Sequence, residues 1–399
     1  MKFVLDFWVQ LGNWLEGVLS GWGVPVWGVN LIIDIVLAVI LLVVGILAVI
    51  IFTPMERKVI ARMQDRPGPN RVWPYGTLIA FADAIKMLTK EDIVPRKSDK
   101  GLHMLAALLV AMPAVLIFAV LPFGRGVIGQ NLNVGILFIL AIGSIHVLAV
   151  LIAGWGANNK FSLLSAFRVV NQLLAYEIPM VLCILAVVLF TDTMSMQGIV
   201  ERQTIPFFVV MPVAGFIFLI CAMAEANRSP VDLLEADSEM VAGYMVEYSG
   251  MKFAMFFIAE YVNMFAVAII ISTLFLGGYK FFGLEDVAPV LSPVIVFAKA
   301  CLVIFVMLWF RGTFPRMRFD QLVSFSWKFF VPLSLVNLLL AALVVKLPIA
   351  NPKAAPWVEG AVMLIANIAL LAVTFFILNR AARRIEGPSA LKRIVAVER

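Results

Sequence analysis

The residues best suited to chemistry are six carboxylates in the segment 225–252, which contains only two cations. Asp232, Glu235 and Glu239 lie at i, i+3 and i+7, so a helix would place them on one face. Like charges this close cannot all ionise comfortably, and their repulsion raises the pKa of some of them. We predict a partly buried, proton-exchanging cluster; a solvated acidic face is the alternative. The six are Glu225, Asp232, Glu235, Asp237, Glu239 and Glu247.

Two further carboxylates lie inside apolar runs, Glu177 in LLAYEIPMVLC and Glu260 in FFIAEYVNMF. A carboxylate within a membrane is costly and indicates function by default. The alternative for each is a helix-to-helix hydrogen bond. Lys299 also lies in an apolar run, but its long side chain could extend to a helix end. A series of carboxylates entering the membrane is typical of a proton path.

Thiols and imidazoles are too sparse to suggest a redox centre. Cys183, Cys221 and Cys301 each lie alone in an apolar run, without CxxC spacing. His103 and His146 lie in different segments, whereas a membrane haem generally takes a pair of axial histidines. We expect this chain to bind no haem, flavin, iron–sulfur cluster or metal. The cysteines and His146 are then packing residues.

The composition predicts an all-α polytopic membrane protein. Of 399 residues, 63% are apolar and 14% charged, with a mean hydropathy of +1.01. Soluble domains carry about 25% charged residues, and only lipid can solvate such an apolar exterior. A spanning helix needs about 20 apolar residues. We predict nine spans, at 29–52, 103–122, 134–153, 170–190, 206–224, 253–276, 293–310, 329–346 and 357–378.

Lysine and arginine are unevenly divided between the two sides of these spans. The loops after odd-numbered spans and the C-terminal tail hold 24, and the other side holds six. Basic residues favour the cytoplasmic side. We therefore predict a multi-pass membrane protein with its N-terminus outside and its C-terminus in the cytoplasm. The same division favours an odd number of spans.

The loop 53–102 is long and has its own structure. Pro67, Gly68 and Pro69 break any helix there, and an amphipathic surface helix follows. Such a loop could wall the mouth of an amphiphilic cavity, although ordinary positive-inside anchoring is the alternative. The apolar face of the helix comprises Leu78, Ile79, Ala82 and Ile85, and its polar face Asp83, Lys86 and Lys90.

We divide the chain into three parts. Residues 1–28 form an interfacial N-terminal segment, and 29–346 an eight-helix core whose loops 53–102 and 224–252 carry the chemistry. Residues 347–399 add a further spanning helix and a basic tail.

Five long motifs occur in the order typical of one family. They are ERKVIARMQDRPGPNRV, LTKEDIVP, LLAYEIP, AEANRSPVDLLEADSEMVAGYMVEYSGMKFAMFFIAEY and RGTFPRMRFDQLVSFSWKFFVPLSLVN. On these residues the chain resembles the heel subunit, the quinone-tunnel membrane subunit, of proton-pumping NADH:quinone oxidoreductase (respiratory complex I). The resemblance implies that ubiquinone or menaquinone enters a tunnel from the bilayer, and that this subunit forms the entrance and much of the wall. The iron–sulfur cluster and catalytic residues then belong to adjoining peripheral-arm subunits.

The resemblance also implies roles for individual residues. Proton coupling would fall to the six loop carboxylates with Glu177 and Glu260, while Arg311, Arg316, Arg318 and Asp320 would be structural or interfacial. The implied partners are the peripheral-arm quinone-site and terminal iron–sulfur subunits, neighbouring small membrane-arm subunits and the lipid bilayer, with no nucleic acid. The quinone cavity would involve Glu56, Arg57, Arg66, Arg71, Asp83 and Arg228.

Three alternatives are open to the same sequence. The chain could be the equivalent subunit of a membrane-bound hydrogenase or of a ferredoxin- or F420-dependent complex. It could be an autonomous transporter, although we find neither internal repeats nor inverted pairs of interrupted helices. A purely structural anchor would leave the buried carboxylates without a purpose.

Overall fold

The structure is a computed structural model. It describes residues 17–18, 20–21, 25–228, 230–232, 243–281, 283, 289–346 and 356–385. Most of the predicted interfacial segment 1–28 lies outside these residues, as do Glu235, Asp237, Glu239 and most of the basic tail. In the described part every regular element is a helix, as predicted.

Within the residues that the structure describes, eight helices are long and apolar enough to cross a membrane. They are α3 (Val26–Met63), α5 with η2 (Lys100–Leu116, Ile117–Ala119), α6 (Gly135–Gly156), α7 (Lys160–Thr191), α12 (Gly250–Phe275), α14 (Ser292–Thr313), α15 through α16 (Phe319–Phe325, Ser326–Phe330, Val331–Lys346) and α17 (Pro356–Ile385). Shorter elements are η1 (Pro74–Gly76), α4 (Ile79–Thr89), α8 (Met196–Arg202), η3 (Gly243–Met245) and η4 (Pro289–Leu291).

The predicted span 206–224 is divided into two helices. α9 (Phe207–Val210) and α10 (Pro212–Glu225) are separated by one residue, Met211. The ring of Pro212 disfavours a helical conformation at the residue before it, and Met211 has φ −127° and ψ 65°. The short α10 therefore ends within the protein at Glu225.

α3 extends 11 residues beyond the predicted end of its span at 52, as far as Met63. Pro54 removes one helical N–H donor, but the Thr53 hydroxyl bonds the Val49 carbonyl at 2.7 Å in the same turn. Glu56 and Arg57, expected in a loop, therefore lie on a helix. The helix ends before the predicted Pro67–Pro69 turn, and the predicted amphipathic helix follows as α4.

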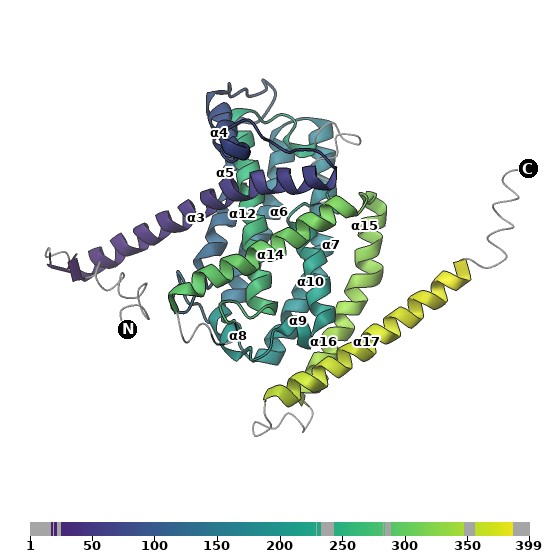
Figure 1. The fold of residues 1–399 in the computed structure, drawn as a ribbon. Coiled ribbons are helices and arrows are strands. Elements are labelled where there is room, and N and C mark those ends of the chain that lie inside the picture. The colour runs from purple at the N-terminus through teal and green to yellow at the C-terminus, as the bar shows by residue number, and fades with distance from the viewer. Residues whose placement is uncertain are drawn as a thin grey trace, which may run out of the picture.

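α12 is the central helix, and 78% of its apolar window is buried. It packs against α5, α14, α3 and α10. α3 and α14 run obliquely across the more upright α5, α6, α7 and α12 (Figure 1). α4 lies at one end of the molecule, which we call the loop-1 face, and α8 and α9 lie at the opposite face (Figure 1).

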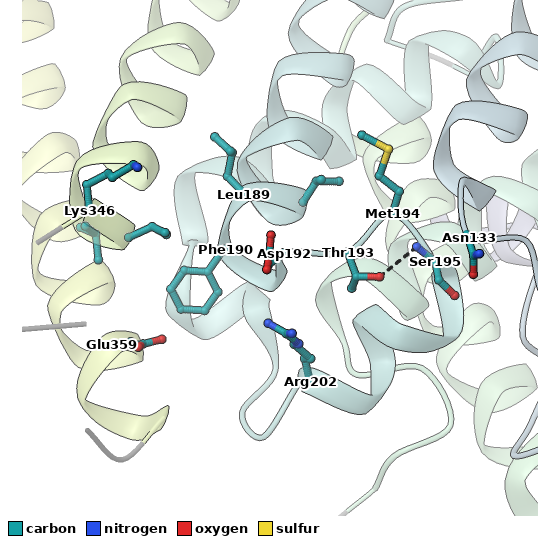
Figure 2. A pocket seen from close by; sticks show the side chains of 13 residues that line it. Asn133, Leu189, Phe190, Asp192, Thr193, Met194, Ser195, Arg202, Lys346 and Glu359 are labelled. Carbon is teal, nitrogen blue, oxygen red and sulfur yellow. Dashed lines mark hydrogen bonds between the residues drawn. The ribbon is translucent and has the colours of Figure 1, made fainter. Parts of the chain in front are cut away.

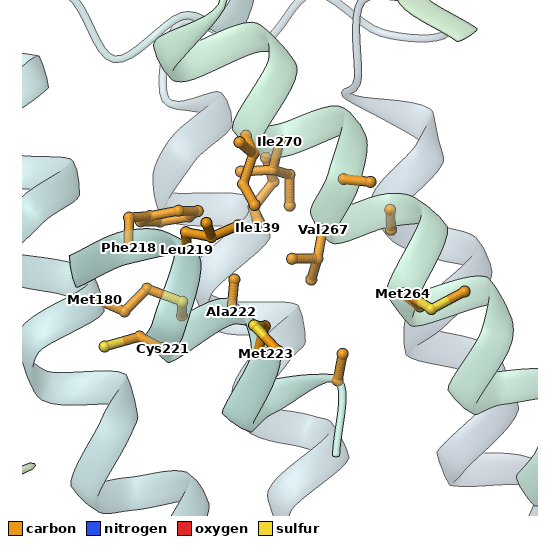
Figure 3. Close-up of a cluster of buried hydrophobic side chains, with 14 of the residues drawn as sticks. Ile139, Met180, Phe218, Leu219, Cys221, Ala222, Met223, Met264, Val267 and Ile270 are labelled. Carbon is orange, nitrogen blue, oxygen red and sulfur yellow. The ribbon is translucent and has the colours of Figure 1, made fainter. Parts of the chain in front are cut away.

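Side chains from α6, α7, α10 and α12 form the core beside the buried carboxylates. Figure 3 shows Met180, Phe218, Met264 and Ile270 in this cluster, and each is at most 7% exposed. α6 and α7 approach closely because Gly154 has no side chain, and a Cβ there would collide with the Cβ of Ala166. Small residues at such crossings allow membrane helices to pack backbone to backbone.

Candidate functional site

Arg228 lies between two carboxylates in the interior. Its Nη1 donates to Glu56 Oε1 at 2.9 Å, and its Nη2 lies 3.5 Å from Glu260 Oε1. The guanidinium also covers the Tyr261 ring, 4.6 Å from the centroid. The side chains of Arg228, Glu56 and Glu260 are only 3%, 5% and 11% exposed. Charges so buried are stable only when paired.

Arg311, in the last turn of α14, also donates to Glu56 Oε1. Glu56, Arg228, Glu260 and Arg311 are called here the Arg228 cluster. Two carboxylates and two guanidiniums leave the cluster with no net formal charge. Three helices meet at it, because Glu56 comes from α3, Glu260 from α12 and Arg311 from α14.

The backbone around Arg228 is fixed by α7 and α10. Asn227 takes a left-handed conformation with φ 49°, and the Arg228 N–H then bonds Met223 O at 3.0 Å to close α10. Gln172 of α7 donates to Ala224 O at 3.2 Å and to Val231 O at 2.7 Å. This amide therefore clamps the chain on both sides of Arg228.

A cavity of about 330 Å³ borders the Arg228 cluster. Ile60, Met63 and Gln64 of α3 line one side, and Arg311, Gly312 and Arg316 another, with Asp232 from the acidic segment. Cavities of about 300–1,000 Å³ hold small organic ligands. Apolar, amide, carboxylate and guanidinium groups around this one suit an amphiphilic ring.

Three small cavities lead from the cluster into the helix bundle. One of about 10 Å³ is lined by Glu260, Asn263, His146 and Glu225. Cavities of about 20 and 30 Å³ both extend from Glu225 to Glu177. These volumes are about what one or two water molecules require. Glu260, Glu225 and Glu177 thus share a series of water-sized cavities with mixed polar and apolar walls.

Tyr244 adds a hydroxyl-bearing side chain to the lining of the 10 Å³ cavity. Burial, and after it the Glu260 carboxylate, raises the pKa of Tyr244 above its usual range. Its phenol therefore stays protonated. Ser162 of α7 donates to the Tyr244 carbonyl at 2.8 Å, which fixes η3 against the bundle.

The structure brings some predicted residues together and separates others. Glu56, Arg228 and Glu260 meet in the Arg228 cluster, and Glu177 and Glu225 share cavities. Asp232 is buried, with 7% exposure, and lines the 330 Å³ cavity. Glu235, Asp237 and Glu239 lie outside the described residues.

The other predicted residues lie nearer the surface. Arg57 pairs with Asp83 of α4 at 2.7 Å, with side chains 44% and 39% exposed. Arg66 and Arg71 are exposed, and Arg66 Nε donates to Gln64 Oε1 at 2.9 Å. Glu247 accepts from Asn159 at 2.8 Å and belongs to a separate polar group with His103.

Lys299 is held by backbone carbonyls. Its ammonium donates to the carbonyls of Leu276, Gly278 and Lys280 at 2.7, 2.7 and 2.6 Å. A cation at the C-terminal end of a helix is favourable, and these carbonyls include the end of α12. Lys299 thus extends to a helix end, as the sequence analysis considered possible for its long side chain.

Most of the chain, including the residues of this site, is similar in sequence to known proteins. The sequence model of the NADH dehydrogenase family matches residues 35–342. The chain belongs to this family. The H subunit of NADH-quinone oxidoreductase from Dehalococcoides mccartyi (strain CBDB1) is 48% identical over 327 residues, which are 82% of this chain and 89% of that protein. The proteins of the same name from Brevibacillus brevis and Phocaeicola vulgatus are 45% and 42% identical, over 80% and 84% of this chain and 95% and 96% of theirs.

The resemblance carried by the five motifs is thereby confirmed. As a member of this family, the chain is a multi-pass membrane subunit of NADH:quinone oxidoreductase and assembles with other subunits of complex I. The match begins within α3, continues through most of α16 and leaves α17 outside it.

Sequence reasoning did not assign four residues to this candidate site. Arg311 was expected to be structural or interfacial, and its contact with Glu56, which Arg228 shares, was not predicted. His146 and Asn263 line the small cavities, and the Tyr261 ring supports Arg228. The sequence signals for these residues were the polar side chains of His146, Asn263 and Tyr261 within apolar helices, and the position of Arg311 at the end of such a helix.

Proposed function

We propose that this subunit forms part of the quinone cavity wall and couples quinone reduction to proton movement. The observation that carries the proposal is the Arg228 cluster, which lies between the 330 Å³ cavity and the water-sized cavities around Glu225. Through this cluster, a change of charge in the 330 Å³ cavity can alter the electrostatic potential at the small cavities around Glu225. The names of the relatives support quinone as the substrate.

The reaction explains why charge must move. Reducing a quinone to a quinol takes two electrons and two protons, and adds negative charge near the ring until the protons arrive. We propose that this charge attracts Arg311 and Arg316 at the cavity. Arg228 then shifts its balance between Glu56 and Glu260, because each carboxylate competes for the same guanidinium.

The bundle interior provides the next step. When Arg228 favours Glu56, Glu260 loses part of its stabilising charge and gains affinity for a proton. Water in the small cavities would relay that proton between Glu260, Glu225 and Glu177 by hydrogen bonds. Asp232, Glu235, Asp237 and Glu239 would feed the same path from the acidic segment, with Glu247 at its edge.

Electron carriers in this proposal belong to the adjoining peripheral-arm subunits. Arg57, Arg66 and Arg71 are exposed and would contact that arm. Small membrane-arm subunits would cover part of the apolar surface. The cation distribution supports a cytoplasmic loop-1 face. In this proposal the membrane is a bacterial cytoplasmic membrane, and the substrate is ubiquinone or menaquinone.

The test is a Glu225→Gln variant in the assembled complex. Glutamine preserves the shape but cannot carry the proton, so we expect quinone reductase turnover and proton uptake into inverted vesicles to fall at least about tenfold. NADH oxidation by an artificial acceptor that bypasses quinone should be unchanged. Glu91→Gln alters an exposed carboxylate and serves as the matched control. Wild-type turnover and uptake in an intact Glu225→Gln complex would refute the coupling role.

Tagging the chain in its native membrane tests the assembly itself. A co-purifying complex with inhibitor-sensitive NADH:quinone reductase activity is expected. A chain that purifies alone and conducts ions would instead support a transporter, and oxidation of hydrogen or ferredoxin a sister complex.

A further inference from the structure

A large pocket lies at the face opposite the loop-1 face, where α7 and α16 end and α17 begins (Figures 1 and 2). Its volume is about 800 Å³. The last turns of α7 and α16 provide an apolar wall of Val188, Leu189, Phe190, Val344 and Val345. Because both helices are candidate membrane spans, an apolar wall in their last turns would lie beside the lipid chains near the membrane surface.

Four charged residues line the polar part of the pocket. Figure 2 shows Asp192 and Arg202 on the side of α7 and α8, and Lys346 and Glu359 on the side of α16 and α17. Among the residues that the structure describes, no ion pair joins any two of these four. Two cations and two carboxylates thus line one pocket without neutralising each other directly.

The α8 side of the pocket is preorganised. Lys280 donates to the carbonyls on either side of Arg202, Glu201 O at 2.7 Å and Gln203 O at 3.2 Å. The Gln203 amide in turn donates to Thr273 O of α12 at 2.8 Å. Arg202 is therefore held on a backbone segment tied to the central helix.

Asp192 is fixed in a similar way. It ends α7 in a left-handed conformation with φ 52°, and its N–H bonds Val188 O at 2.8 Å. The carboxylate thus follows directly after the apolar turn that lines the pocket. Phe190 is also held, with its ring packed edge-on against Phe207 of α9 at 5.5 Å.

We propose that this pocket binds one phospholipid whose headgroup carries both a phosphate and a primary amine. Arg202 and Lys346 would bind the phosphate, and Asp192 and Glu359 the ammonium, while the acyl chains follow the apolar wall. A purely anionic headgroup would face two uncompensated carboxylates. A soluble zwitterion would leave the apolar wall unused. The lipid links the α7–α8 turn to α16 and α17, and α17 lies outside the part that matches the family.

The experiment uses the assembled complex, purified in mild detergent and washed until only tightly bound phospholipid remains. Native mass spectrometry and extraction then identify what is retained, before and after adding phosphatidylethanolamine or phosphatidylglycerol. We expect retained phosphatidylethanolamine, bound about tenfold more tightly than phosphatidylglycerol, because only its ammonium can pair with the two carboxylates. Arg202→Gln/Lys346→Gln should lose it. Arg380→Gln removes one cation from the exposed far end of α17 and should retain it.

Two results would overturn the proposal. One is equal or stronger binding of phosphatidylglycerol by the wild-type complex, a competition that needs no variant to fold. The other is undiminished retention of phosphatidylethanolamine by the double variant. Neither readout involves quinone, so failure here leaves the proposed function untouched, and the reverse also holds.

Discussion

Glu56→Gln tests whether the Arg228 cluster holds α3, α12 and α14 together. Glu56 accepts hydrogen bonds from both Arg228, at 2.9 Å, and Arg311, and these three side chains are 5%, 3% and 21% exposed. Glutamine has nearly the same shape but no charge. The substitution therefore leaves two guanidiniums on either side of a neutral amide, in an interior that solvates them poorly.

Losing one partner of a buried ion pair costs about 3–5 kcal/mol. Glu260, at 3.5 Å, still compensates Arg228 in part, so the lower end, about 3 kcal/mol, applies. That corresponds to more than about a hundredfold in a folding or assembly equilibrium. The amount of assembled complex should fall, and the remainder should dissociate at a lower temperature on native gels after heating.

Asp83→Asn is the matched control. Asp83 pairs with Arg57 at 2.7 Å, a comparable distance, but its side chain is 39% exposed and its partner's 44%. Exposed pairs contribute only about 0–1 kcal/mol, so Asp83→Asn should assemble like the wild type. If the two variants dissociate at the same temperature, burial does not determine the strength of these pairs and the reasoning fails.

Three further predictions test other parts of the molecule. Glu235→Gln should lower quinone reductase turnover at least about tenfold in an intact complex, and normal turnover would contradict proton coupling through the acidic segment. Lys299→Met removes an ammonium bonded to three carbonyls near the end of α12, so heated complexes should dissociate earlier, and an unchanged dissociation temperature would exclude this structural role. Gly154→Ala introduces a Cβ that collides with α7, at about 1–3 kcal/mol, and should reduce assembly; Gly45→Ala makes only ordinary contacts, the nearest at 3.5 Å, and should not.

The sequence predicted the helices well where the membrane dictates them. A spanning segment must satisfy its own backbone hydrogen bonds in lipid, so long apolar runs such as Gly135–Gly156 are reliable signals. Hydropathy does not indicate where a helix ends when that end lies outside the lipid, in water or within the protein. α3 accordingly continues for 11 residues past its predicted end, and the single predicted span at 206–224 is interrupted at Met211.

The candidate site was harder to predict because its contacts are long-range. Arg228 and Glu56 are separated by 172 residues, and Arg311 and Glu56 by 255. Local spacing could mark each charge as unusual but could not pair them. His146 and Asn263 carry no formal charge in apolar helices, so only the packing of α6, α10 and α12 shows that both line the cavity beside Glu225.

The neutrality of the Arg228 cluster explains how it can be stable at rest and still respond in the proposed function. A unit charge 4 Å from Arg311 interacts with it by about 4 kcal/mol at an effective dielectric constant of 20. Breaking a buried pair costs about 3–5 kcal/mol, so the two energies are comparable. A charge that appears in the 330 Å³ cavity can therefore draw Arg311 from Glu56, which then competes more strongly for Arg228. Glu260 is left with less compensation, and the disturbance reaches the cavities around Glu225 without any redox chemistry in this chain.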